Sequence, residues 1–230
     1  MKRLIVFLCL IFMLMPCSIS RAFEDISDTQ TQNAVETLTG YSILSGYEDG
    51  TFRPNNSITR AEFSKIIVAT GNLYCMVENP IVFEDTADHW AKEYIDIARY
   101  NGIINGMSDT VFAPDEKLTN EQAVKMIVCM LGYAKNAQQS GGYPDGFMTT
   151  ADTLGLLNGL NISGKAYATR GDVAVMIFRA LDVPYLVTDE NGNLLEDISA
   201  DLTLRTIHEE LLQFNNSDEY FDISDENSVG

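Results

Sequence analysis

The sequence predicts an all-α fold of three helical repeats followed by a small acidic C-terminal extension. A register of 60 residues, from Phe23 to Phe83, relates the first two repeats, and a period of this size indicates a duplicated supersecondary unit. Other pairs in the same register are Gly46 with Gly106, Phe52 with Phe112, Thr59 with Thr119 and Lys65 with Lys125. Within each unit, apolar residues recur at the spacing of a buried helix face. Such units bury these faces against one another, so we expect the functional site between repeats.

Each of the first two repeats is expected to contain two helices joined by a loop rich in turn-forming residues. First helices are predicted after Asp28 and Asp88, and the one after Asp88 should end near Gly102. Second helices are predicted from Arg60 to Thr70 and from Thr119 onward to Gly132. The buried face of the first helix in repeat two is predicted to carry Trp90, Tyr94, Ile95 and Ala98.

A third repeat is recognisable in shortened form. Gly155 to Gly159 matches Gly102 to Gly106, and Thr169 opens a helix that should extend to Leu181. The loop is shorter than in the other repeats and lacks the Phe-x-Pro element, a common kind of change in a terminal repeat. The expected division is residues 1–22 as a signal peptide, 23–82, 83–140 and 141–184 as repeats one to three, and 185–230 as an acidic tail. Within the tail, Asn191-Gly192 predicts a hairpin, and residues 204–214 predict a short amphipathic helix.

The N-terminal residues have the features of a secretory signal. Lys2 and Arg3 precede an apolar run over residues 4–15, and Ser20-Arg21-Ala22 provides a small-residue cleavage site. The run is shorter than the roughly 20 residues that span a bilayer. We therefore expect an exported protein with no membrane segment after signal removal. Lipid attachment at Cys17 is the alternative at this end of the chain.

The charge of the chain and its few reactive side chains exclude several classes of function. The chain has 33 acidic and 15 basic residues, a net charge of −18, and no basic stripe, which excludes a nucleic-acid partner. No nucleophile–base pair or metal-ligand cluster is present, so we expect neither an enzyme nor a cofactor or metal site. Signal removal leaves Cys75 and Cys129, interpreted as two buried thiols, with a single disulfide as the alternative.

A four-residue box stands at the start of each second helix. Threonine followed three residues later by an acidic or amide side chain is typical of a helix-capping box, and the pairs are Thr59 with Glu62, Thr119 with Gln122 and Thr169 with Asp172. Capping does not explain Arg60 and Arg170, because a cation in the first turn meets the positive end of the helix dipole, at a cost of roughly 0.3–1 kcal/mol. Two explanations stay open. One is a local ion pair, for example with Glu62. The other is an anionic ligand held by free helix amides and the guanidinium.

The segments Gly46–Pro54 and Ile58–Glu62 resemble the S-layer homology domain, as do Asp88–Ala91 and Gly102–Gly106. The resemblance covers Phe23 to about Leu181 and recurs three times in order. It implies a pseudo-three-fold prism of helical repeats, with grooves that hold secondary cell-wall polysaccharide of Gram-positive bacteria. In this family the glycan is often pyruvylated and anionic.

The resemblance also implies roles for individual residues. The box arginines Arg60 and Arg170 would meet the ketal carboxylate, and Gly46 and Gly106 would let a sugar approach the backbone, although a turn or helix-end glycine explains them equally well. Trp90 is a candidate for stacking on the sugar, with a place in the core as the alternative.

The chain departs from the family pattern at positions that matter for binding. Asn120 replaces the box arginine in repeat two, and repeat three has lost its full loop, so at most two grooves should bind. The expected function is non-covalent anchoring of a secreted protein at the cell wall or S-layer. The alternative is an extracellular interaction or assembly module whose acidic tail docks a protein partner.

Overall fold

The computed structural model describes residues 23–75, 77, 83–186 and 206–207. Over these residues the fold is all-α, with isolated β-bridges and no strand. The predicted signal peptide, the tail hairpin and most of the tail helix lie outside the described residues. No helix within them is long and apolar enough to cross a membrane. The helices are α2 (Thr29–Gly40), α3 (Arg60–Thr70), the 3-10 turn η1 (Glu84–Thr86), α4 (Lys92–Tyr100), α5 (Asn120–Met130), α6 (Ala134–Gln139), α7 (Asp145–Thr153) and α8 (Arg170–Ala180).

The second helix of each repeat, α3, α5 or α8, begins at its box. At α3, the Thr59 hydroxyl accepts from the Glu62 amide at 3.2 Å, and the Glu62 carboxylate accepts from the Thr59 amide at 2.7 Å. The same reciprocal pair starts α5, with Gln122 in place of glutamate. At α8, Thr169 accepts from the Asp172 amide but donates its hydroxyl to the Asp172 carboxylate at 2.7 Å. A side-chain bond therefore takes the place of the second capping bond in the third repeat.

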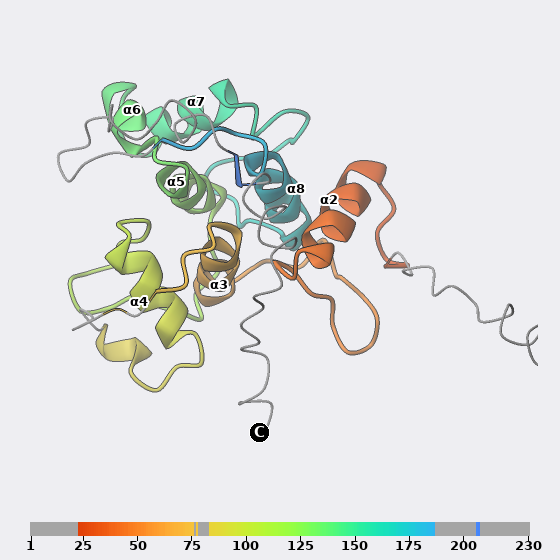
Figure 1. The fold of residues 1–230 in the computed structure, drawn as a ribbon, viewed down its shortest axis with the longest axis horizontal. Helices are drawn as coiled ribbons and strands as arrows, with labels where there is room; N and C mark the ends of the chain where they lie inside the picture. Colours follow the sequence, from red (N-terminus) through yellow and green to blue (C-terminus); the bar gives the residue numbers. More distant parts are fainter. Residues whose placement is uncertain (1–22, 76, 78–82, 187–205, 208–230) are drawn as a thin grey trace, which may run out of the picture.

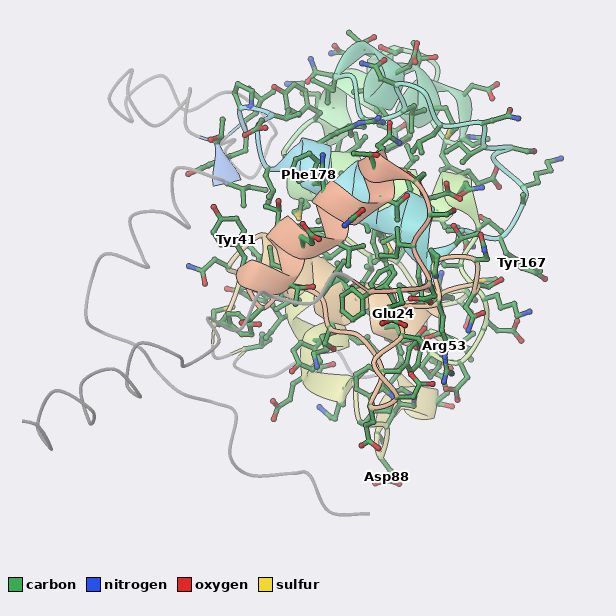
Figure 2. All side chains as sticks on the ribbon, turned by 90° about the vertical axis from the view of Figure 1, so that its right-hand side faces the viewer. Glu24, Tyr41, Arg53, Asp88, Tyr167 and Phe178 are labelled. Atoms are coloured by element: carbon green, nitrogen blue, oxygen red, sulfur yellow. The ribbon has the colours of Figure 1, made fainter. Side chains whose placement is uncertain are left out.

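The segments that precede these three helices form a closed ring of backbone hydrogen bonds. Ile58 N donates to Ala168 O at 3.1 Å, Leu118 N donates to Ile58 O at 3.0 Å, and Ala168 N donates to Leu118 O at 2.8 Å. All three residues are fully buried. Tyr167, next to this ring, is 54% exposed and lies at the edge of the folded part in Figure 2. Each repeat thus donates one backbone hydrogen bond to one neighbour and accepts one from the other, so the three repeats form a closed ring.

The first helices pack between repeats. α2 packs on α8, α4 packs on α3, and α7 packs on α5 and α6. Figure 1 shows α3, α5 and α8 gathered in the middle, with α2, α4 and the α6–α7 pair outside them in three directions. Each first helix therefore covers the second helix of a different repeat, as expected of repeats that cannot bury their apolar faces alone. The largest fully buried side chains include Phe52, Phe63, Phe83, Phe112 and Phe147.

The first helix of repeat two differs from its prediction. It begins at Lys92, because residues 84–91 form η1 and a following turn in which the His89 ring accepts from the Ala91 amide at 3.1 Å. Trp90 lies in this turn and is 58% exposed, so the expectation that it packs in the core is wrong. On the predicted face, Ile95 and Ala98 are fully buried. The helix α6, at the end of repeat two, was not predicted from the sequence.

The two cysteines and the segment after α8 complete the description. Cys75 and Cys129 are free thiols, and Cys75 is exposed, so the interpretation of two buried thiols is wrong for Cys75.

After α8 the chain returns to the end of α5, where Tyr133 donates its hydroxyl to Pro184 O at 2.8 Å and Leu186 N donates to Leu131 O at 2.9 Å. The first residues of the predicted tail are therefore packed on the repeats.

Candidate functional site

The backbone amides at the helix starts are occupied by loops of a neighbouring repeat. At α3, Arg60 N donates to Glu116 O at 3.0 Å and Ala61 N donates to Pro114 O at 2.9 Å. The loop of repeat three does the same for α5, and the loop of repeat one for α8. The third amide of each helix bonds to the capping threonine. The expectation that free amides would hold an anion is therefore wrong, and any anion bound at these helix starts must be held by side chains.

Arg60 extends from α3 into the loop of repeat two and is only 6% exposed. Its Nε donates to Phe112 O at 2.8 Å, its Nη2 donates to Asn105 O at 3.2 Å, and its guanidinium lies 4.3 Å from the centre of the Phe112 ring. Burial lowers the pKa of Arg60. The local ion pair with Glu62 is not formed, because that carboxylate is engaged in the cap. Among the described residues, Arg60 forms no salt bridge, and its Nη1 has no hydrogen-bond partner.

A cleft of about 170 Å³ opens beside this guanidinium. Its lining residues come from all three repeats: Arg60 from the first, the loop Ile103–Met107 and α5 from the second, and Tyr143 from the third. The cationic lining residues are Arg60 and Lys125, and no Asp or Glu is among the described residues that line the cleft. In a chain with a net charge of −18, this is a local concentration of positive charge.

Lys125 and Tyr143 form the far wall of the cleft. With the Asn105 amide oriented to satisfy both of its neighbours, its Oδ1 accepts from Lys125 Nζ at 3.1 Å and its nitrogen donates to Ile104 O at 3.1 Å. Lys125 Nζ also lies 5.5 Å from the centre of the Tyr143 ring. Tyr143 is 45% exposed and donates its hydroxyl to Glu121 at 3.3 Å. Burial, together with the Glu121 charge, raises the pKa of Tyr143 to about 12, so this wall presents a neutral phenol.

Sequence analysis assigned no binding role to Lys125 and Tyr143. Two signals in the sequence point to them. Lys125 repeats Lys65 in the 60-residue register, as a basic residue in an otherwise apolar helix. Tyr143 falls where Trp90 stands in repeat two.

Arg170 makes the equivalent contacts where repeat three meets repeat one, a place called the Arg170 groove below. Its Nε donates to Phe52 O at 3.0 Å and its Nη2 donates to Ser45 O at 2.9 Å, which repeats the Arg60 contacts in the 60-residue register. The difference lies in the covering side chains. The Tyr47 ring centre is 4.9 Å from the Arg170 guanidinium and 4.0 Å from that of Arg53, so this ring contacts two cations.

The third groove, between repeats two and three, has different chemistry. Asn120 is 2% exposed, its Nδ2 donates to Ser163 O at 2.9 Å, and its Oδ1 has no partner among the described residues. Another arginine, Arg179, lies elsewhere: it donates to Leu156 O at 2.9 Å and to Gln30 at 3.0 Å, and so joins repeats three and one. The guanidinium seen in the other two grooves is therefore replaced by a buried amide.

The structure gives Gly46 and Gly106 a packing role. A Cβ on Gly106 would lie 2.2 Å from Ser108 O and 2.4 Å from the Phe83 ring, and one on Gly46 would lie 2.1 Å from the Phe23 ring. Gly106 also lines the Arg60 cleft. Trp90 is not among the residues that line this cleft, and its ring contacts His89 and Tyr94 at centroid distances of 5.5 Å and 6.5 Å.

The comparisons with known proteins agree with this architecture for two repeats. Residues 22–64 and 82–124 each match the S-layer homology domain. These two matches correspond to repeats one and two, and the third repeat stays a prediction at the level of the family.

Several curated proteins are similar over a larger part of the chain. "Middle cell wall protein" of Brevibacillus brevis is 28% identical over 78% of this chain and 17% of its own length. "Cell surface protein" of Thermoanaerobacter kivui is 30% identical over 70% of this chain and 21% of its own. "Cellulosome-anchoring protein" of Acetivibrio thermocellus is 32% identical over 47% of this chain and 25% of its own. The chain thus spans about a fifth of the length of these relatives. The domain matches and these relatives support a secreted protein associated with the cell wall.

Proposed function

We propose that the three repeats anchor a secreted protein to the Gram-positive cell wall by binding an anionic secondary cell-wall polysaccharide in the clefts between repeats. The observation that carries this proposal is that Arg60 lines a cleft in which, among the described residues, its Nη1 has no hydrogen-bond partner and its guanidinium forms no salt bridge. The S-layer homology domains support attachment to the wall in general terms. The names of the relatives, one a cell wall protein and one a cellulosome-anchoring protein, point in the same direction.

The physical argument concerns the unpaired charge of Arg60. Its guanidinium is largely buried, and within the described part of the chain its hydrogen bonds go to backbone carbonyls, while the Asp85 charge acts on it without a direct ion pair. Buried charges in proteins are normally paired, because desolvation is costly. A carboxylate on a sugar would pair with Nη1 through a charge-assisted hydrogen bond. The fold thus holds a desolvated cation at the place where an acidic ligand could reach it.

The remaining lining residues suit a sugar. Tyr143 offers a half-exposed aromatic face, and Asn105 and Gln122 offer amide groups for hydroxyls. Pockets that combine an aromatic surface with a few fixed polar groups are typical of small-molecule sites. We propose a pyruvylated amino sugar as the unit bound, with Arg60 and Arg170 as the cations that meet its carboxylate and Gly106 at the cleft edge. Trp90 is proposed as a stacking surface beside the Arg170 groove.

The proposal is tested by co-sedimentation of the purified protein with cell-wall sacculi, with and without their attached polysaccharide. Arg60→Ala and Arg170→Ala should each weaken association with intact sacculi, and the double variant should nearly abolish it. Losing a charge-assisted contact costs on the order of 1.5–3 kcal/mol, or roughly ten- to a hundredfold in affinity. Asn120→Ala, in the groove without an arginine, is the matched control and should bind like the parent. If the double arginine variant is folded and sediments as well as the parent, the proposal is wrong.

A further inference from the structure

One lining position of the Arg60 cleft differs in charge from its counterpart in the 60-residue register. Gln122, the third residue of α5, lines the Arg60 cleft. Its counterpart in the 60-residue register is Glu62, the third residue of α3. Both side chains accept from the amide of their capping threonine, Gln122 at 3.1 Å and Glu62 at 2.7 Å. The local geometry is therefore preserved, while the charge is neutral in one groove and negative in the other.

The cations beside the two arginines correspond in the same register. In the Arg60 cleft, Lys125 Nζ bonds to the neutral Asn105 amide, and its counterpart beside Arg170 is Lys65. Glu121 accepts from the hydroxyl of the Tyr143 wall but does not itself line the cleft. Each arginine is therefore accompanied by a lysine, and the difference in charge at the lining position is that between Gln122 and its counterpart Glu62.

We infer that the Arg60 cleft is the dominant, anion-selective site, in which Lys125 acts as a second binding cation and the neutral Gln122 preserves the positive potential. Glu62 weakens the Arg170 groove for the same acidic ligand. This inference rests on the proposed function. It adds that the Arg60 and Arg170 grooves bind the acidic ligand with unequal affinity, and it names the residues that set the selectivity for anions. It also assigns opposite consequences to the glutamine and the glutamate of two otherwise equivalent capping boxes.

The test uses isothermal titration calorimetry of the purified full-length protein with two probes, an amino sugar carrying a pyruvate ketal and its methyl ester. Gln122→Glu should weaken binding of the free acid by roughly tenfold, because a carboxylate is placed beside the ligand anion at low dielectric. Lys125→Gln should have an effect of similar size. Neither variant should change the weak binding of the neutral ester. Glu62→Gln should strengthen the second site, so that the fitted stoichiometry for the acid rises from one towards two.

Two controls separate this effect from loss of folding and from net charge. Because Glu62 already forms the same cap, Gln122→Glu should keep the start of α5 intact and leave the thermal midpoint close to that of the parent. Gln139→Glu, at an exposed residue of α6 that does not line the cleft, adds the same charge and should bind like the parent.

The outcomes distinguish this inference from the proposed function. If Gln122→Glu and Lys125→Gln bind the acid as the parent does, while Arg60→Ala loses it, the inference is overturned and the anchoring proposal stands. If Arg60→Ala also binds normally, both fail. Equal loss of acid and ester in Gln122→Glu also overturns the inference, because charge would not be the cause.

Discussion

Gly106→Ala tests whether the loop glycine of repeat two is required for folding or for sugar binding. The added Cβ would lie 2.2 Å from Ser108 O, 2.7 Å from Val111 O and 2.4 Å from the Phe83 ring. Two of these atoms belong to the backbone of the same tight loop and cannot move aside cheaply. Overpacking of this kind typically costs about 1–3 kcal/mol, and a fold of this size loses roughly 2–4 °C in thermal midpoint per kcal/mol. We therefore expect a midpoint lower by about 2–12 °C, measured by circular dichroism at 222 nm.

A matched glycine in the same protein provides the control. Gly40 ends α2, and a Cβ there would meet nothing within 4 Å. Gly40→Ala should therefore leave the midpoint unchanged or raise it slightly, because alanine favours the helix by up to about 1 kcal/mol. Unaltered stability of Gly106→Ala, combined with loss of binding to sacculi, would refute the packing argument and assign the glycine to close approach of the sugar.

Three further predictions concern other parts of the chain. An isolated fragment of residues 23–71 should show no cooperative thermal transition, because helix α8 and the partners of Ile58 in the hydrogen-bonded ring, Leu118 and Ala168, are absent. A sharp transition would contradict the closed-ring description. At pH 8, a thiol reagent should label exposed Cys75 quickly and Cys129 slowly, since burial raises the pKa of Cys129 to about 11. Equal labelling rates of the two thiols in the folded protein would count against the burial of Cys129. Deleting residues 208–230, which keeps the packed segment Pro184–Leu186 and the buried Ile207, should leave wall binding unchanged or slightly stronger at low salt, because an acidic tail repels an acidic glycan. A large loss on deletion would instead support docking through the tail.

The helices that begin at the boxes could be predicted from the sequence because the signals are local. Thr59 and Thr119 start their helices as expected, and α3 has the predicted bounds. Trp90 was misplaced because its spacing fits the face of α4, whereas the turn stabilised by His89 delays the helix start. That turn depends on a hydrogen bond from a side chain to the backbone, which apolar periodicity does not report.

The candidate site could be predicted only in part, because its partners come from different repeats. Arg60 was identified as a residue that capping could not explain, and the structure places it at the base of a cleft. The carbonyls that bind it belong to Asn105 and Phe112, far along the chain. Likewise, the occupation of the α3 amides by Glu116 and Pro114 follows from the packing of repeat two on repeat one. Sequence spacing shows which residues repeat, but not which neighbour they meet.

The closed ring gives a physical reason for keeping a third repeat that has lost much of its own loop. Repeat three supplies Ala168 to the ring and Ala166 O and Gly164 O to the start of α5. It also supplies Tyr143, the wall of the Arg60 cleft, which lies between two other repeats. If repeat three were removed, the α5 amides would lose their partners and the Arg60 cleft its aromatic wall. The shortened repeat is therefore needed to build the Arg60 cleft, even though the groove between repeats two and three carries the Asn120 amide where the others carry a guanidinium.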